Sequence, residues 1–307
     1  MIGRLVSLAV GAGLAALVLW YLLTPKVLAA FGDAVRGADW PLLAAATLLS
    51  GAVQWLRAWR FSVLTYGTPA LPDGRLVRIA CKLNALNFLL PFRLGEFSYP
   101  ILMQRTFGQS LTSAAGVLLW ARVFDLLTVG AILTGTAAAL GVVPDPAISA
   151  TLWVAAACLA IAPAGLAVAS RAAAPLLTRR SVLALMAPVS RGATAVDGRG
   201  APLAAVVLSF VIWLVFGLLA ALAANAVTDT INPAVALLGA SAGNLAFALP
   251  VNGIAGLGPS QAAWAALVST AGVPWSDAVI SALAVYAVTF TGALVFGGVA
   301  VATGAQR

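Results

Sequence analysis

Four charged side chains stand inside otherwise apolar stretches of the sequence: Arg93, Glu96, Arg122 and Asp125. An arginine at the centre of a membrane-spanning helix costs about 2.5 to 3.5 kcal/mol on insertion scales. Charges at that depth must therefore be paired, hydrated or bound to a ligand. Two interpretations follow: a buried ion-pair network that pins two segments together, or an internal site for a lipid headgroup. In such a site an arginine grips a phosphate, and a carboxylate holds a cationic or hydroxylated group.

The first two charges lie beside an expected helix break. Pro91 and Gly95 should end the preceding helix, because proline removes a backbone donor and glycine tolerates a turn. Residues 80 to 90 rise about 16 Å as a helix, which is half of the roughly 30 Å hydrocarbon thickness. The charges after the break would then lie near the bilayer centre. From this segment we expect four substrate-binding residues: Asn87, Arg93, Glu96 and Tyr99.

Arg122 and Asp125 form a second pair, within the apolar stretch 111 to 141. The helix from Leu111 to Arg122 rises about 16 Å, so these charges also lie at mid-depth. A spacing of three residues places them on one helix face, where they can pair with each other. Because the four charges comprise two of each sign, pairing among them can be complete. We expect both residues to contribute to a substrate site.

A third candidate is the loop from Pro250 to Gln261, which contains three glycines within six residues. A helix is expected to start near Pro259, and backbone amides at a helix N-terminus can face an anion. The alternative is that glycines serve only close helix packing, as we expect for Gly239 and Gly243. The candidate binding residues of this loop are Asn252, Gly256, Gly258 and Gln261.

Composition sets the fold class. Hydrophobic residues make up 62% of the 307 residues and charged residues only 8%, which excludes a soluble domain. We expect one all-α domain over residues 1–307: a polytopic membrane helix bundle with six spanning helices and two broken, re-entrant helical segments. The spanning helices are expected at residues 5–23, 42–64, 111–141, 148–169, 202–227 and 278–303. The broken segments are expected at 80–105 and 233–272, where prolines and glycines interrupt the apolar sequence.

Basic residues predict the orientation. Placing both termini in the cytoplasm puts 13 of the 17 basic residues on the inner side, Arg57 and Arg60 among them. Only Lys26 and Arg36 then fall outside. In this arrangement the first broken segment enters and leaves from the inside, and the second from the outside. The two segments would dip toward each other, as half-helices do in many transporters.

Composition and motifs also exclude several functions. The sequence has no histidine, the commonest metal ligand, and its nine acidic residues are few for a metal-dependent transferase. No Walker A, GxSxG, HExxH or DxD-type motif occurs, so we expect no metal, no cofactor and no catalytic residue. Cys81 and Cys158 lack CxxC spacing and are interpreted as buried small hydrophobes. The basic residues flank apolar spans, which favours anionic lipid headgroups over nucleic acid as partners.

Two stretches resemble a known family. The sequence from Asn87 to Asp125 reads N-F-L-L-P-F-R-L-G-E-F-S-Y-P, then R-T-F-G-Q-S, then a membrane helix with R-x-x-D. It resembles the first signature of the lysylphosphatidylglycerol synthase transmembrane region, also called the flippase-like family. The loop from Pro250 to Gln261, followed by Ala271-Gly-Val and a last helix, resembles the second signature. The family loop commonly ends in a glutamate where this chain has Gln261.

The resemblance implies that the chain moves a lipid rather than makes one, since the soluble aminoacyl-transferase domain of the two-part enzymes is absent from this sequence. By resemblance the partner is an anionic phospholipid or a polyprenyl-phosphate-linked glycolipid, and the location is a bacterial-type cytoplasmic membrane. We expect a flippase-like transporter and not an enzyme. Assembly into a homo-oligomer is possible. The alternative is an integral-membrane enzyme or accessory subunit of lipid or glycolipid biosynthesis, for which Glu96 is the best acid or base candidate.

Overall fold

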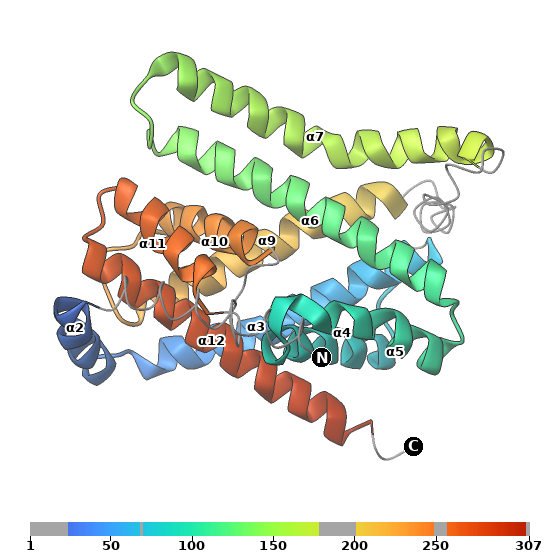
Figure 1. Ribbon diagram of the computed structural model, residues 1–307, viewed down its shortest axis with the longest axis horizontal. Coiled ribbons are helices and arrows are strands. Elements are labelled where there is room, and N and C mark those ends of the chain that lie inside the picture. Colours follow the sequence, from blue (N-terminus) through green and yellow to red (C-terminus); the bar gives the residue numbers. More distant parts are fainter. Residues whose placement is uncertain (1–23, 68–69, 178–200, 249–256, 305–307) are drawn as a thin grey trace, which may run out of the picture.

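The computed structural model describes residues 24–67, 70–177, 201–248 and 257–304, and every regular element within these ranges is a helix. The helices are α2 Pro25–Arg36, α3 Trp40–Tyr66, α4 Gly74–Leu89, the 3-10 helix η1 Pro91–Phe97, α5 Ser98–Phe107, α6 Leu111–Ala139, α7 Pro146–Leu177, α9 Ala201–Asn225, α10 Pro233–Ala248, α11 Pro259–Thr270 and α12 Trp275–Ala302. The all-α prediction is confirmed for these ranges. Figure 1 shows the helices gathered in one bundle, with α7 at its outer edge.

Four of the described helices are long and apolar enough to cross a membrane: α6, residues Pro146–Leu166 of α7, residues Leu203–Asn225 of α9, and α12. They coincide in position with four of the predicted spans. α3 has 27 residues and matches the predicted span 42–64, but its sequence is less apolar because Gln54, Arg57 and Arg60 interrupt it. The predicted span 5–23 lies outside the described residues. The predicted count of six spans is therefore not confirmed.

Aspartates begin two of the central helices. The Asp39 carboxylate accepts a hydrogen bond from the Leu42 amide at 3.0 Å and caps α3. Asp73 caps α4 in the same way, accepting from the Arg75 amide at 2.8 Å. α3 ends at Gly67, whose φ of 69° lies in the left-handed region that favours glycine. The short connection lets α4 turn back along α3.

The first broken segment, α4–η1–α5, folds as a hairpin. The guanidinium carbon of Arg75, at the start of α4, lies 4.9 Å from the ring centroid of Phe107, at the end of α5. Both ends of the segment therefore lie at the same end of the bundle, as predicted for a re-entrant element. The tip of the hairpin is η1, where Arg93 has a φ of 55° that residues other than glycine rarely adopt.

α10 and α11 form the second hairpin. Gly239 on α10 faces the ring of Trp264 on α11, and Gly243 faces the Ser260 carbonyl one turn nearer the tip. A Cβ at Gly239 would lie only 2.7 Å from the nearest Trp264 ring atom, so glycine is what allows the two helices to approach. The prediction that both glycines serve close packing is confirmed. α11 begins at Pro259, as predicted.

The two hairpins start from opposite ends of the bundle because α3 and α9 run antiparallel. The Asp39 amide before α3 donates to the Ala226 carbonyl just after α9, at 2.8 Å. Near the other ends, Arg60 of α3 donates to the Ser209 hydroxyl of α9 at 2.9 Å. The first hairpin follows the end of α3 and the second follows the end of α9. Each hairpin therefore turns back into the bundle from a different end (Figure 1).

The last turn of α4 and the last turn of α10 meet inside the bundle. The ring centroids of Phe88, in the last turn of α4, and Phe247, in the last turn of α10, lie 5.7 Å apart. The guanidinium carbon of Arg93 lies 5.1 Å from the same Phe247 ring. Phe88 also contacts the rings of Tyr286 and Phe290 on α12. The prediction that two broken segments dip toward each other is confirmed.

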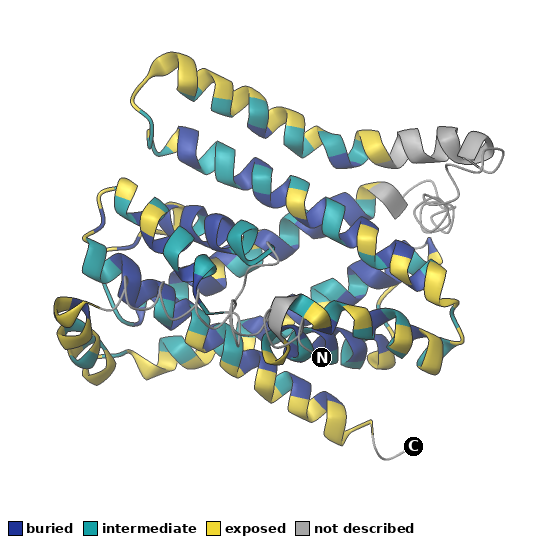
Figure 2. Ribbon diagram, viewed as in Figure 1, coloured by how far each residue is buried: buried dark blue, intermediate teal, exposed yellow. Residues whose placement is uncertain are grey.

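Two helices lie at the periphery. α7 packs mainly against α6, and most of its described outer surface is exposed (Figure 2). Cys158 on α7 is exposed, so its expected burial is wrong; an apolar neighbourhood in the sequence does not distinguish a core face from an outer face. α2 is absent from the predicted elements because its twelve residues are too short for a span. Apart from the buried Val27, α2 is largely exposed.

Replacing Gly95 by alanine is expected to disrupt the tip of the first hairpin. A Cβ at Gly95 would lie 2.5 Å from the Asn87 amide nitrogen and still closer to the Leu86 carbonyl carbon, both backbone atoms of α4. Backbone atoms do not move aside cheaply, so we expect a loss of about 1 to 3 kcal/mol of unfolding free energy, measured by thermal unfolding in detergent. The control is Gly74→Ala, where the new Cβ has nothing within 4 Å. Equal unfolding temperatures for the two variants would contradict this account.

Candidate functional site

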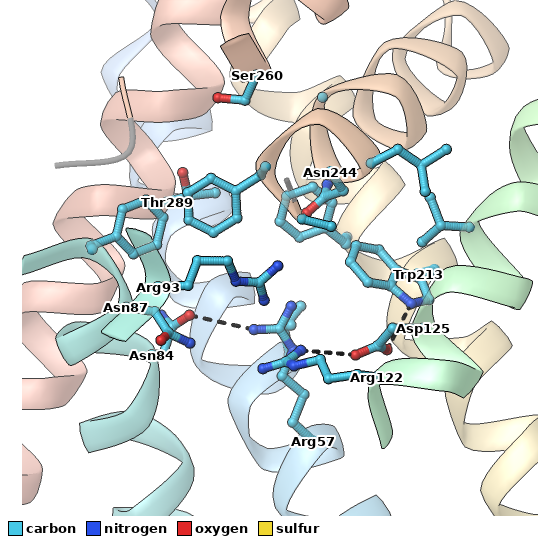
Figure 3. Close-up of a pocket in the computed structure, with 18 of the residues that line it drawn as sticks. Arg57, Asn84, Asn87, Arg93, Arg122, Asp125, Trp213, Asn244, Ser260 and Thr289 are labelled. Carbon is cyan, nitrogen blue, oxygen red and sulfur yellow. Dashed lines mark hydrogen bonds and ion pairs between the residues drawn. The ribbon is translucent and has the colours of Figure 1, made fainter. Parts of the chain in front are cut away.

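A cavity of about 590 Å³ lies inside the bundle beside η1 and the ends of α4 and α10. α3, α4, α5, α6, α9, α10, α11, α12 and η1 all contribute to its wall, which is mainly apolar. Figure 3 shows the side chains of Arg57, Arg93 and Arg122 converging from α3, η1 and α6. Among the described residues, the charged side chains that line the cavity are Arg57, Arg93, Glu96, Arg122 and Asp125.

Asp125 is paired mainly with Arg60. Nη1 and Nη2 of Arg60 donate to the two Asp125 carboxylate oxygens at 2.6 and 3.1 Å, and the two side chains are 1% and 8% exposed. The expected position of Arg60 on the inner membrane surface is therefore wrong. Its guanidinium instead forms a buried bidentate ion pair that joins α3 to α6, a geometry that adds orientation as well as energy.

The Asp125 carboxylate is saturated with donors. Besides the two bonds from Arg60, it accepts one from Arg122 Nη1 at 3.0 Å and one from the Trp213 indole nitrogen at 3.0 Å. An ionised carboxylate has about four lone-pair sites, so these four bonds occupy them all. The predicted pairing of Arg122 with Asp125 is confirmed. The geometry of Asp125 matches the ion-pair network interpretation, because it joins α3, α6 and α9.

Glu96 connects this network to the first hairpin. One of its carboxylate oxygens, Oε1, lies 2.6 Å from Arg93 Nη2 and 3.0 Å from Arg122 Nε. Both contacts are ion pairs. A single negative charge is thus shared by two guanidinium groups.

Arg57 is the second arginine whose expected surface position is wrong, since its side chain lines the cavity. Nη1 of Arg57 makes one long hydrogen bond, at 3.4 Å, to the side-chain oxygen of Asn84. The guanidinium carbon lies 5.8 Å from the Trp213 ring centroid, and Nε is buried without a hydrogen-bond partner. Within the described ranges no carboxylate forms an ion pair with Arg57.

The cluster therefore carries a surplus of two positive charges. Its members are the arginines Arg57, Arg60, Arg93 and Arg122 and the carboxylates Glu96 and Asp125. The expectation of two charges of each sign is wrong, because α3 supplies two further arginines that the sequence does not place beside the others. Unbalanced charge away from water costs several kcal/mol per ion, and an anion in the cavity would relieve that cost.

The other predicted residues lie in different surroundings. Asn87 and Gln261 line the cavity, and the Asn87 side-chain oxygen is buried without a hydrogen-bond partner. Gln261 Oε1 accepts a hydrogen bond from the Gly258 amide at 2.7 Å and so caps the start of α11. Tyr99 does not line the cavity. It is fully buried in the apolar core, with its ring centroid 4.6 Å from that of Phe61.

The structure describes the predicted glycine loop only from residue 257 onward. Asn252 and Gly256 lie outside the described residues. Gly258 has a left-handed φ of 117°, which requires glycine, and it is the N-cap residue of α11. Its amide already donates to Gln261, and Gly258 does not line the cavity. For Gly258 this arrangement differs from the predicted amide that faces an anion, while residues 250–256 of the loop lie outside the described residues.

Sequence reasoning missed Arg57, Arg60 and Trp213 as parts of the site. Both arginines lie inside the predicted span 42–64, and that position was the available signal for burial. Trp213 lies in a uniformly apolar helix and carries no such signal. The charged groups of the site are guanidinium and carboxylate groups, and in the described part of the chain no three His, Cys, Asp or Glu side chains lie together.

Comparison with known proteins identifies the family. No curated protein and no solved structure matches the chain. The sequence profile of one family of membrane domains, the lysylphosphatidylglycerol synthase TM region, matches residues 5–297. This range covers nearly the whole chain and contains both hairpins and every charged residue of the cavity. The chain therefore belongs to the lysylphosphatidylglycerol synthase TM region family.

Proposed function

We propose that the protein is a flippase-like transporter that moves an anionic phospholipid or a polyprenyl-phosphate-linked glycolipid across the cytoplasmic membrane. The observation that carries the proposal is the surplus of positive charge in a cavity where two re-entrant hairpins meet. Membership of a family of membrane domains is consistent with this role.

The physical reason is the barrier that a headgroup meets in hydrocarbon. A phosphate that leaves water without new partners pays a desolvation cost of many kcal/mol. The side chains of Arg57, Arg93 and Arg122 line the cavity. A guanidinium group matches phosphate geometry and is more weakly hydrated than an ammonium group. These side chains can therefore replace water around the headgroup and lower the barrier.

The apolar part of a lipid also has a path. Phe97, Leu119 and Leu126 line the cavity and are at the same time 71%, 46% and 48% exposed. The cavity wall thus continues to the outer surface of the bundle between the first hairpin and α6. An acyl or polyprenyl chain could remain in the bilayer there while the headgroup occupies the cavity.

We also propose that both termini face the cytoplasm. Removing Arg57 and Arg60 from the count leaves eleven basic residues on the inner side, against Lys26 and Arg36 outside. The asymmetry on which the orientation depends is therefore preserved.

The proposal is tested by reconstitution. Full-length protein in proteoliposomes is expected to accelerate leaflet exchange of labelled phosphatidylglycerol relative to empty vesicles. Arg93→Gln is expected to lower the exchange rate at least about tenfold, because a hydrogen bond from a charged donor contributes about 1.5 to 3 kcal/mol and 1.4 kcal/mol is tenfold. Exchange is measured by chemical quenching of the label in the outer leaflet.

The matched control is Arg105→Gln. Arg105 is exposed in the last turn of α5 and does not line the cavity, so its replacement removes one positive charge without touching the site. Its exchange rate should equal that of the unmodified protein. If no lipid tested is exchanged faster than in empty vesicles, and the same preparation converts a lipid substrate, the alternative of an integral-membrane enzyme replaces transport.

A further inference from the structure

We propose that the cavity selects lipids whose headgroups carry two negative charges over lipids whose headgroups carry one. This inference rests on the proposed function and names the class of lipid that the same site takes. The shared chemistry is a dianionic headgroup, supplied by two phosphodiesters, a diphosphate or an ionised phosphomonoester.

Internal pairing leaves part of the positive charge of the cluster unbalanced. Arg60 and Asp125 neutralise each other in a bidentate pair and leave no charge for a ligand. Glu96 offers one negative charge to both Arg93 and Arg122. Arg57 has no ion pair within the described ranges. Two positive charges thus remain uncompensated at the cavity.

The number and origin of the guanidinium groups at the cavity point the same way. Arg57, Arg93 and Arg122 all line it. They come from α3, η1 and α6, and Figure 3 shows the three side chains directed toward a common region. Donors that approach from three elements suit a ligand with acceptor oxygens on more than one side, as in two phosphates or one phosphomonoester.

The surroundings of these guanidinium groups have a low dielectric constant. Most of the remaining wall is apolar, with Trp213 and Phe247 against the guanidinium groups of Arg57 and Arg93. Charge that stays unbalanced in such surroundings is costly, because water does not screen it well. A monoanion leaves one positive charge unbalanced, whereas a dianion balances both. The surplus of two charges therefore discriminates by ligand charge.

Gln261 provides a variant that changes the cavity charge and keeps the local structure. Its side-chain oxygen accepts from the Gly258 amide, and a glutamate oxygen can accept the same hydrogen bond. A carboxylate in the first turn of α11 also interacts favourably with the helix dipole. Gln261→Glu should therefore keep the cap while lowering the surplus from two charges to one. Arg57→Gln lowers it by one through an unrelated position.

The experiment is displacement of fluorescent phosphatidylglycerol from full-length protein in detergent by unlabelled lipids. The competitors are phosphatidylglycerol with one charge, cardiolipin with two phosphodiesters, and phosphatidic acid at pH 8. The unmodified protein should prefer cardiolipin and phosphatidic acid by at least about tenfold, which is 1.4 kcal/mol. Gln261→Glu and Arg57→Gln should each reduce that preference several-fold. Gln104→Glu on the exposed surface of α5 adds the same charge outside the cavity and should leave it unchanged.

Equal or tighter binding of phosphatidylglycerol by the unmodified protein would overturn the inference. If Gln104→Glu changed the preference as much as Gln261→Glu does, the inference would also be overturned, because the effect would then reflect the net charge of the protein. Leaflet exchange of labelled phosphatidylglycerol and labelled cardiolipin is measured on the same preparation. Acceleration of both without a charge preference in binding leaves the proposed transport standing and refutes only the selectivity.

Discussion

Asp125→Ala is expected to lower the free energy of unfolding by about 3 to 5 kcal/mol, because it removes one partner of a buried ion pair. The substitution leaves the Arg60 guanidinium, which is 1% exposed, without a counter-charge. It also removes the acceptor for Arg122 and for the Trp213 indole. A loss of this size lowers the unfolding temperature by on the order of 10 °C. Thermal unfolding of the purified protein in detergent measures it.

Two further variants isolate the cause. Arg60→Met combined with Asp125→Leu removes both charges and should recover most of the lost stability, since an apolar pair of similar volume needs no counter-charge. Asp33→Ala breaks the Asp33–Arg36 pair, whose N–O distance is 2.8 Å but whose side chains are 77% and 78% exposed. Its cost should stay under about 1 kcal/mol. If Asp125→Ala costs no more than Asp33→Ala, the buried network does not hold α3, α6 and α9 together.

Arg122→Gln is expected to slow leaflet exchange by about 10- to 100-fold. Arg122 ties the tip of the first hairpin to the helix α6, since its Nε lies 3.0 Å from Glu96 and its Nη1 donates to Asp125 at 3.0 Å. Its loss removes one charge-assisted hydrogen bond and one ion pair, of which the bond alone is worth about 1.5 to 3 kcal/mol. The substitution also removes one of the three guanidinium groups available to a headgroup. Exchange in proteoliposomes is the measurement.

A double-mutant cycle with Glu96→Gln tests whether Arg122 and the hairpin tip act as one unit. We expect a coupling free energy of about 0.5 to 3 kcal/mol in thermal unfolding, as is usual for residues in one ion-pair network. The control cycle combines Arg122→Gln with Arg36→Gln on the peripheral helix α2, where the effects should add. Strict additivity between Arg122 and Glu96 would refute the coupling.

The features that were predictable from the sequence depend on short stretches of chain. The 62% hydrophobic content requires a membrane bundle, and in the described residues that bundle is all-helical. The breaks near Pro91 and Pro259 follow from the backbone chemistry of proline and glycine. The pairing of Arg122 with Asp125 follows from a spacing of three residues on one helix. In each case neighbours in the sequence are also neighbours in space.

Burial on one side of a helix was less predictable. Tyr99 and Asn87 come from the same short stretch, yet Tyr99 packs in the core against Phe61 while Asn87 lines the cavity. Cys158 has an apolar neighbourhood and is nevertheless exposed. In a chain this apolar, the contrast between polar and apolar faces that normally orients a helix is weak. Which face is buried is then decided by helix packing.

The sequence by itself thus determined that the chain is a membrane helix bundle, that two segments break, and that charges collect beside a break. Only the tertiary structure decided the charge balance of the cavity. Arg60 lies 65 residues before its partner Asp125, and Trp213 lies 88 residues after it. The position of these arginines of α3 inside the predicted span 42–64 indicates burial, but it does not say which groups they meet. Their pairing depends on the antiparallel packing of α3, α6 and α9, and the surplus of two positive charges exists only because that packing brings four arginines to two carboxylates.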